Sequence, residues 1–195
     1  KFTDEQHGVA VGDKGTILTT RDGGVHWDKV KTNVRENLYS VGFYDSRNGI
    51  AVGSAGITLR TVDGGANWQD QESALKLNLF GIQVFGPTSA IAVGELGAVV
   101  VTRDGGKTWE IQPGITSKVL QAVVYRGGTR LWVAGRGGAM LKRTETLSPQ
   151  VVTIPLGIPI LKTDSRDRVK PRLPLITITD DGDIPVAPPP KRPDR

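Results

Sequence analysis

The stretch GDKGTILTTRDGGVHW, residues 12–27, decides the fold because close copies of it follow twice more along the chain. Aligning the sequence with itself gives a repeat of 41 residues without gaps. One glycine column contains Gly12, Gly53, Gly94 and Gly135, and a second contains Gly15, Gly56, Gly97 and Gly138. So regular a period predicts one small structural unit that is copied along the chain.

Within one repeat, short apolar segments alternate with turn residues, which predicts four β-strands. For the repeat at residues 38–78, the predicted strands are residues 38–44, residues 50–52, residues 57–61 and a segment that begins at Trp68. In the first strand, Tyr39, Val41 and Phe43 are expected to share one apolar face, because alternate side chains point to the same side. Four strands in a repeat of this length are typical of a β-propeller blade. We therefore predict an all-β propeller of four-stranded blades, with about four blades present.

The two ends of the repeat region depart from this pattern. Phe2 aligns with Phe43, so the first unit starts partway through its first strand. We therefore expect an open arc of a larger ring, with any signal peptide lying upstream. In the fourth unit the turn residues are replaced at 145–150, and VVTI at 151–154 is a candidate for its fourth strand. We assign residues 1–154 to the propeller blades.

Residues 155–195 have a different composition. Of the 12 prolines in the chain, 10 lie at or after Pro149, and proline removes a hydrogen-bond donor from a strand ladder. We interpret this segment as a Pro-rich basic tail. Residues 174–187 weakly resemble in sequence the third strand and Asp-box turn of a repeat, with Asp181 in the position of Asp104. A degenerate fifth blade is therefore the alternative for this part of the tail.

The motif T-x-D-G-G-x-x-W lies at the predicted turn between the third and fourth strands of three repeats. An aspartate at a turn accepts backbone hydrogen bonds, adjacent glycines adopt positive φ, and a tryptophan covers the space between sheets. Copies in successive blades cannot converge on one reaction centre, so we expect a structural role. Its residues are Thr20, Asp22, Gly23, Gly24, Trp27, Thr61, Asp63, Gly64, Gly65, Trp68, Thr102, Asp104, Gly105, Gly106 and Trp109.

Composition argues against several classes of partner. The net charge of +5 comes from 25 basic and 20 acidic residues that are interspersed, so no concentrated basic stripe indicates nucleic-acid binding. No apolar stretch reaches the roughly 18 residues of a membrane-spanning helix. The sequence has no cysteine and therefore no disulfide or thiolate metal site. We expect a chain with no direct membrane span and no nucleic-acid partner.

Catalytic patterns are weak. The histidines, His7 and His26, have no second imidazole or carboxylate cluster at metal-ligand spacing. GGKT at 105–108 lacks the first glycine of a phosphate-binding loop, since Val101 stands there. We therefore expect no catalytic residue, no metal and no cofactor. A glycoside hydrolase whose paired carboxylates lie outside this chain is an alternative that the residues leave open.

The three boxes TRDGGVHW, TVDGGANW and TRDGGKTW resemble Asp-box, or BNR, repeats, although His26 and Asn67 depart from the Ser/Thr position that Thr108 keeps. With AVG-x-x-G before each third strand, residues 2 to about 145 are similar to the photosystem II stability and assembly factor family of propellers. The resemblance implies a non-catalytic scaffold in the periplasm or thylakoid lumen that binds a photosystem II subunit or another membrane-protein assembly intermediate. The alternatives are a fragment of a secreted sialidase-like hydrolase and an envelope-associated binding protein.

Strand alternation predicts that the G-x-x-G turns and the connections between blades lie opposite the Asp boxes. Loop tips on such a face vary over a constant scaffold, as expected of a binding surface. The partner-binding candidates on this face are Asp13, Lys14, Arg35, Glu95 and Arg136. The resemblance also implies an arginine-rich surface, for which the further candidates are Arg21, Arg60, Arg103 and Arg143.

Overall fold

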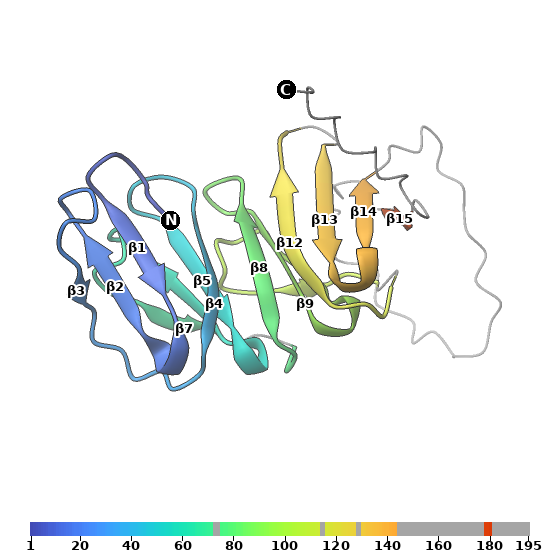
Figure 1. The fold of residues 1–195 in the computed structure, drawn as a ribbon, viewed down its shortest axis with the longest axis horizontal. Helices are drawn as coiled ribbons and strands as arrows, with labels where there is room; N and C mark the ends of the chain where they lie inside the picture. Colours follow the sequence, from blue (N-terminus) through green and yellow to red (C-terminus); the bar gives the residue numbers. More distant parts are fainter. Residues whose placement is uncertain (72–74, 114–115, 128–129, 144–177, 181–195) are drawn as a thin grey trace, which may run out of the picture.

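The structure is a computed structural model that describes residues 1–71, 75–113, 116–127, 130–143 and 178–180. These residues form four antiparallel sheets placed side by side (Figure 1), so the predicted all-β propeller of about four blades is confirmed. Blade 1 contains β1 (Gly8–Val11), β2 (Ile17–Thr20) and β3 (Asp28–Lys29). Blade 2 contains β4 (Leu38–Phe43), β5 (Gly49–Gly53), β6 (Thr58–Thr61) and β7 (Gln69–Gln71).

The third and fourth blades repeat this order. Blade 3 contains β8 (Leu79–Val84), β9 (Ala90–Gly94), β10 (Val99–Thr102) and β11 (Glu110–Ile111). Blade 4 contains β12 (Leu120–Tyr125), β13 (Leu131–Gly135), β14 (Met140–Arg143) and β15 (Ile178–Asp180). A one-turn 3₁₀ segment joins β1 to β2 in blade 1 and the second strand to the third in the other blades: η1 (Asp13–Gly15), η2 (Ser54–Gly56), η3 (Glu95–Gly97) and η4 (Arg136–Gly138).

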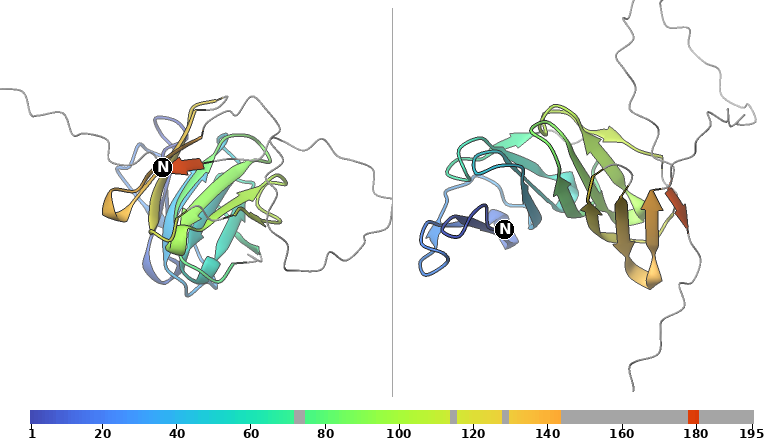
Figure 2. Two further views of the ribbon diagram at one scale, coloured as in Figure 1. Left: turned by 90° about the vertical axis from the view of Figure 1, so that its right-hand side faces the viewer. Right: turned by 90° about the horizontal axis from the view of Figure 1, so that it is seen from above.

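Each blade is a simple meander in which neighbouring strands pair in chain order. Seen from above, the four blades follow a curve, with blade 1 and blade 4 at its two open ends (Figure 2). In blade 1 a single bridge from Phe2 to Gly8 stands where the first strand of the other blades pairs with the second. This matches the alignment of Phe2 with Phe43.

The fourth strand of blade 4 comes from the distant segment Ile178–Asp180. It pairs antiparallel with β14, with Leu141 opposite Asp180 and Arg143 opposite Ile178. The expected segment 151–154 lies outside the described residues. Part of the region that we considered for a degenerate fifth blade therefore supplies a strand to blade 4.

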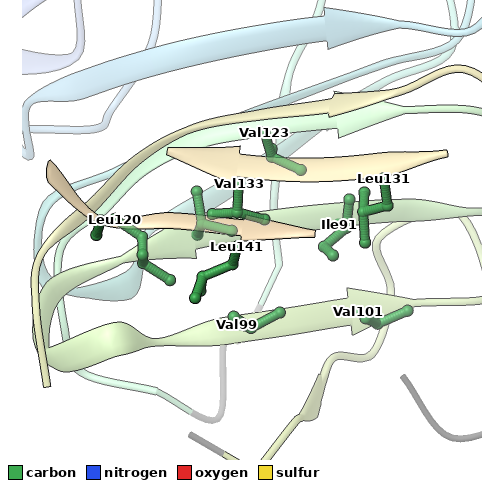
Figure 3. Close-up of a cluster of buried hydrophobic side chains, with 10 residues drawn as sticks. Ile91, Val99, Val101, Leu120, Val123, Leu131, Val133 and Leu141 are labelled. Carbon is green, nitrogen blue, oxygen red and sulfur yellow. The ribbon is translucent and has the colours of Figure 1, made fainter. Parts of the chain in front are cut away.

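The hydrophobic core lies between the blades. One cluster joins Ile91, Val99 and Val101 of blade 3 to Val133 and Leu141 of blade 4 (Figure 3). Two further clusters fill the contacts between blades 1 and 2 and between blades 2 and 3. Burial of these aliphatic side chains is the main stabilising term, at roughly 1.5–3 kcal/mol for each large residue. Each blade thus depends on its neighbour for stability.

The first strand of blade 2 corrects one expectation. A β-bulge between Leu38 and Ser40 shifts the alternation, so that Leu38 is buried and Tyr39 is exposed. Val41 and Phe43 do pack into the core, as expected. The same irregularity recurs between Leu79 and Gly81 in blade 3. The prediction that Tyr39 shares the buried face was therefore wrong, because an extra residue in one strand inverts the side-chain alternation before it.

Asp-box turns and the candidate partner-binding surface

The Asp-box turn of blade 2 is closed by its own polar side chains. The Thr61 hydroxyl donates to Asp63 Oδ1 at 2.8 Å and accepts from the Gly65 N–H at 2.9 Å. Asp63 Oδ1 also accepts from the backbone N–H of Asn67 at 2.9 Å, and Trp68 Nε1 donates to the Gly65 carbonyl at 3.0 Å. Threonine, aspartate and tryptophan are all required at this spacing because each satisfies a backbone group of the same turn.

The residue before the tryptophan differs among the boxes but contacts the same carboxylate oxygen. Asn67 Nδ2 donates to Asp63 Oδ2 at 2.8 Å, and the Thr108 hydroxyl donates to Asp104 Oδ2 at 2.6 Å. In the first box, His26 Nδ1 lies 2.6 Å from Asp22 Oδ2. His26 and Asn67, which depart from the family's Ser/Thr, therefore preserve the hydrogen-bonding geometry of the box.

These contacts favour the ionised aspartates. Hydrogen bonds from the backbone and side chain of His26 lower the pKa of Asp22 to about 2. Burial raises the pKa of Asp63, but hydrogen bonds from Asn67 and Thr61 outweigh it, so the pKa lies below its ordinary value. The same balance lowers the pKa of Asp104. Each carboxylate therefore serves as a fixed acceptor inside its own turn.

All three Asp boxes lie at one edge of the arc, beside the turns between the first and second strands. The N–H of Gly64 donates to the Arg47 carbonyl at 2.9 Å, and the N–H of Gly105 donates to the Thr88 carbonyl at 2.8 Å. A cavity of about 370 Å³ opens at this edge between blades 1 and 2, lined in part by His7, Arg21 and Asp63. The predicted position of the boxes, opposite the G-x-x-G turns, agrees with these contacts.

At the other edge, the 3₁₀ turns meet the connections between blades. Asn37, at the start of blade 2, accepts from the N–H of Lys14 in blade 1 at 3.0 Å through its side-chain oxygen. Asn78, at the start of blade 3, accepts from the N–H of Ala55 in blade 2 at 2.9 Å in the same way. The sequence analysis missed these two residues, although their separation of one repeat was the signal that could have found them.

The middle residues of three turns are held in the left-handed region. Lys14, Ala55 and Leu96 have φ of 53°, 52° and 52°, a conformation that non-glycine residues adopt at a cost. Leu96 also exposes 65 % of its surface.

The charged candidates at this edge differ in their exposure and in their hydrogen bonding. Asp13, Lys14 and Arg136 are exposed. Both carboxylate oxygens of Glu95 are occupied, since they accept from the backbone N–H and the side-chain amide of Asn78 at 3.0 and 2.9 Å. Of the candidates, Lys14 and Arg136 therefore present cationic groups at the turn tips, whereas Glu95 is engaged in holding its own blade.

Arg35 lies in the connection between blades 1 and 2, beside η1, since the Gly15 N–H donates to the carbonyl of Glu36 at 2.8 Å. It lines a groove of about 640 Å³ together with Lys31, Trp68 and Asp70. The lining of the groove therefore combines an indole with two basic and two acidic side chains.

The other arginine candidates are not brought together with the turn tips. Arg21 and Arg103 are exposed within Asp-box turns at the opposite edge, and Arg103 pairs with Glu110. Arg60 is half-buried and lies beside Gly105 of blade 3. Its Nε is 3.5 Å from the place where a Cβ on that glycine would lie. Arg143 lies in β14. Arg21, Arg60 and Arg103 therefore do not join the turn tips in one arginine surface.

Within the described part of the chain, no group of three or more histidine, aspartate or glutamate residues is arranged to hold a metal ion. No helix among the same residues has the length and apolar character needed to cross a membrane.

Meandering four-stranded blades that are closed by T-x-D-G-G-x-x-W turns define the molecule as an Asp-box β-propeller. The chain belongs to the family described as Photosynthesis system II assembly factor YCF48, whose model matches residues 1–114. This confirms the resemblance found in the sequence.

The chain is also similar to solved structures. The chain is 27 % identical, with a TM-score of 0.57, to a structure described as YCF48 bound to D1 peptide, and the match covers 74 % of this chain and 52 % of that chain. It is 20 % identical, with a TM-score of 0.49, to YCF48 from Cyanidioschyzon merolae, over 76 % of this chain and 66 % of that one. The chain thus spans about half the length of the first structure. No curated protein matches it.

Proposed function

We propose that this chain is a scaffold that binds a segment of a photosystem II subunit during assembly of the complex. The observation that carries the proposal is the 27 % identity to a YCF48 chain bound to D1 peptide, over 74 % of the present chain. Membership of the assembly-factor family supports it. The D1 protein is accordingly the first partner to test.

The binding surface that we propose is the edge formed by the four 3₁₀ turns. Lys14 and Arg136 offer cationic groups for carboxylates, and exposed Leu96 offers an apolar contact. Arginine often contributes much of the binding energy at protein interfaces, and its guanidinium pairs well with carboxylates. An extended partner segment with acidic and apolar side chains fits this combination.

In this proposal the chain acts without catalysis. The Asp-box hydroxyls and carboxylates are engaged in their own turns, as the contacts of Thr61 and Asp63 illustrate. Tyr39 and Tyr125, which lie in the first strands of blades 2 and 4, pack against aromatic rings at centroid distances of 5.2 and 4.6 Å. The Asp-box side chains and the two tyrosines therefore have structural roles.

We also propose that the protein acts on the lumenal side of thylakoids or in the periplasm, where a scaffold of this family would meet exposed segments of a membrane subunit. Fusion of the full reading frame to a compartment-specific reporter in a photosynthetic host tests this location. A cytoplasmic signal would refute it.

A capture experiment tests the function. Detergent-solubilised membranes from a photosynthetic source are passed over the immobilised chain, which is expected to retain photosystem II subunits. The double variant Lys14→Glu/Arg136→Glu is expected to lose them, because both cationic groups at the turn tips are reversed. The matched control Arg21→Glu/Lys107→Glu reverses two exposed charges at the Asp-box edge and should retain them. Recovery of unrelated envelope proteins, or loss only in the control, would overturn the proposal.

A further inference from the structure

The cavity of about 370 Å³ between blades 1 and 2 lies at the Asp-box edge, away from the 3₁₀ turns. Blade 1 lines it with the turn that contains Asp4 and His7 and with the end of β2 at Thr19. Blade 2 lines it with its own Asp-box turn, at Asp63 and Gly64. The volume is within the range of roughly 300–1,000 Å³ that is typical of ligand sites. We call this cavity the blade 1–2 pocket.

The corresponding place between blades 2 and 3 is almost filled. Most of the residues that line it stand one repeat after those of the blade 1–2 pocket, yet its volume is only about 10 Å³. Two larger side chains account for this difference in volume. Tyr44 stands where the first pocket has Thr3, and the half-buried Arg60 stands where it has Thr19.

Arg60 shows which backbone groups a guanidinium contacts at this place. Its Nε and Nη2 lie 3.5 and 3.9 Å from the point where a Cβ on Gly105 would lie, and the Pro87 carbonyl oxygen lies 3.5 Å from the same point. One repeat earlier the counterparts are Gly64 and Ser46, and the Ser46 carbonyl oxygen lies 2.9 Å from the point where a Cβ on Gly64 would lie. The blade 1–2 pocket therefore has the same backbone groups, with a short threonine in place of the arginine.

The remaining lining suits the stem of a long basic side chain. Val9, which is 2 % exposed, lines the blade 1–2 pocket beside Thr19 and Thr20. Long basic side chains pack their methylene groups on such apolar surface and leave the charged end near water. In blade 3 the equivalent of Thr19 is Val101, which is buried in the contact with blade 4. In the contacts that blades 2 and 3 make with the next blade, the protein's own side chain thus occupies this position.

The charges on the lining favour a cation. Backbone hydrogen bonds from His7 and Gln6 lower the pKa of Asp4, and the pKa of Asp63 is lowered as well, so both carboxylates are ionised at neutral pH. The Asp4 carboxylate also lies 3.0 Å from the ring of His7. Arg21 is the exposed cation of the same lining. Two carboxylates and one guanidinium therefore line the blade 1–2 pocket.

We propose that the blade 1–2 pocket binds an arginine side chain of a protein partner, in the place that Arg60 fills between blades 2 and 3. The guanidinium lies against Gly64 and the Ser46 carbonyl, with Asp4 and Asp63 as its counter-charges. This site is at the edge opposite the turn tips, so it is separate from the surface proposed above for a photosystem II subunit.

Titration of the full chain with the blocked tripeptide acetyl-Gly-Arg-Gly-amide, followed by nuclear magnetic resonance of the backbone amides, tests this site. We expect saturable shifts at Thr20 and Gly64. The same tripeptide with citrulline in place of arginine should bind about tenfold more weakly, because citrulline keeps the shape of the side chain and lacks its charge. The turn-tip variant Lys14→Glu/Arg136→Glu should bind the arginine tripeptide as the unmodified chain does, which makes this result independent of the proposed function.

Two variants of the pocket have matched controls. Thr19→Arg supplies from blade 1 the side chain that Arg60 supplies from blade 2, so it should abolish the shifts without altering the circular dichroism spectrum. Ser117→Arg adds an arginine at an exposed position between blades 3 and 4 and should leave them unchanged. Asp4→Asn keeps an acceptor for the turn and should weaken binding by about threefold. Asp45→Asn makes the same change in the turn of blade 2 and should have no effect.

Three results would overturn the proposal. The first is an absence of saturable binding to the full chain, including the case in which another segment of the same chain fills the pocket. The second is equal binding of the arginine and citrulline tripeptides, or of the arginine tripeptide by Thr19→Arg and the unmodified chain. The third is loss of binding in Arg21→Ala, which would show that the pocket holds a carboxylate. We expect Arg21→Ala to bind the arginine tripeptide at least as tightly, because it removes a like charge from the lining.

Discussion

The side-chain oxygen of Asn78 in blade 3 accepts a hydrogen bond from the backbone N–H of Ala55 in blade 2, at 2.9 Å. Its own amide and backbone N–H groups donate to Glu95, so one residue joins the turn tips of two successive blades. Ala55 is also one of the residues held at positive φ. The asparagine therefore helps to fix the geometry of the surface that we propose for partner binding.

Asn78→Ala is expected to lower the free energy of unfolding by about 1–2 kcal/mol, because it removes hydrogen bonds on both sides of a blade contact. Urea unfolding measures this loss. Asn33→Ala changes an exposed asparagine in a connection between blades and should shift the free energy by less than about 0.5 kcal/mol. Equal stability of the two variants would show that the bridge through Asn78 contributes nothing.

Asp63→Ala is expected to destabilise the protein by about 1–3 kcal/mol, since the Thr61 hydroxyl and two donors of Asn67 lose their acceptor. Thermal unfolding checks this, with Asp28→Ala on the exposed edge strand β3 as the control. Below the melting temperature the variant should still bind its partner. Unchanged melting together with lost binding would instead make the Asp box a binding site.

Acid should weaken the fold through the Asp-box carboxylates. The pKa of Asp22 falls from 3.8 to about 2 on folding, so its contribution is complete above pH 3.8 and is lost as the pH falls through 2. The lowered pKa values of Asp63 and Asp104 act in the same direction. Urea midpoints measured between about pH 5 and pH 2 should therefore decrease, and they should decrease less in Asp22→Asn. An identical pH dependence in that variant would contradict this explanation.

The first glycine of the G-x-x-G turn should tolerate alanine in blade 1 but not in blade 3. A Cβ on Gly94 would lie 2.0 Å from the carbonyl oxygen of Asn78, whereas a Cβ on Gly12 has no atom within 4 Å. Gly94→Ala is expected to lower the free energy of unfolding by about 3 kcal/mol, at the upper end of the range for overpacking substitutions. Gly12→Ala is expected to lower it by less than about 1 kcal/mol. Chemical denaturation of the two variants measures the difference. Equal losses would refute the close approach as the reason for the glycine.

The sequence allowed a correct prediction of the blades because their determinants are local. A repeat without gaps, the spacing from Thr61 to Trp68 and the alternation of strand residues all lie within one unit. The alignment of Phe2 with Phe43 likewise identified the shortened first blade.

Features that depend on contacts between units were not predictable in the same way. The bulge that exposes Tyr39 interrupts the two-residue alternation of side chains within one strand, and no residue pattern in the sequence marked it. The pairing of β15 with β14 joins segments far apart in the sequence, so no local period could reveal it. The bridges made by Asn37 and Asn78 depend on where one blade sits against the next.

Hydrogen exchange with and without a D1 peptide tests most directly the claim that the turn tips bind a photosystem II subunit. We predict slower exchange on binding at residues 13–15, 54–56, 95–97 and 136–138, and unchanged exchange at the Asp-box turns. Lys14→Glu/Arg136→Glu should abolish the protection. Protection centred on the Asp boxes, or no protection at saturating peptide, would contradict the account.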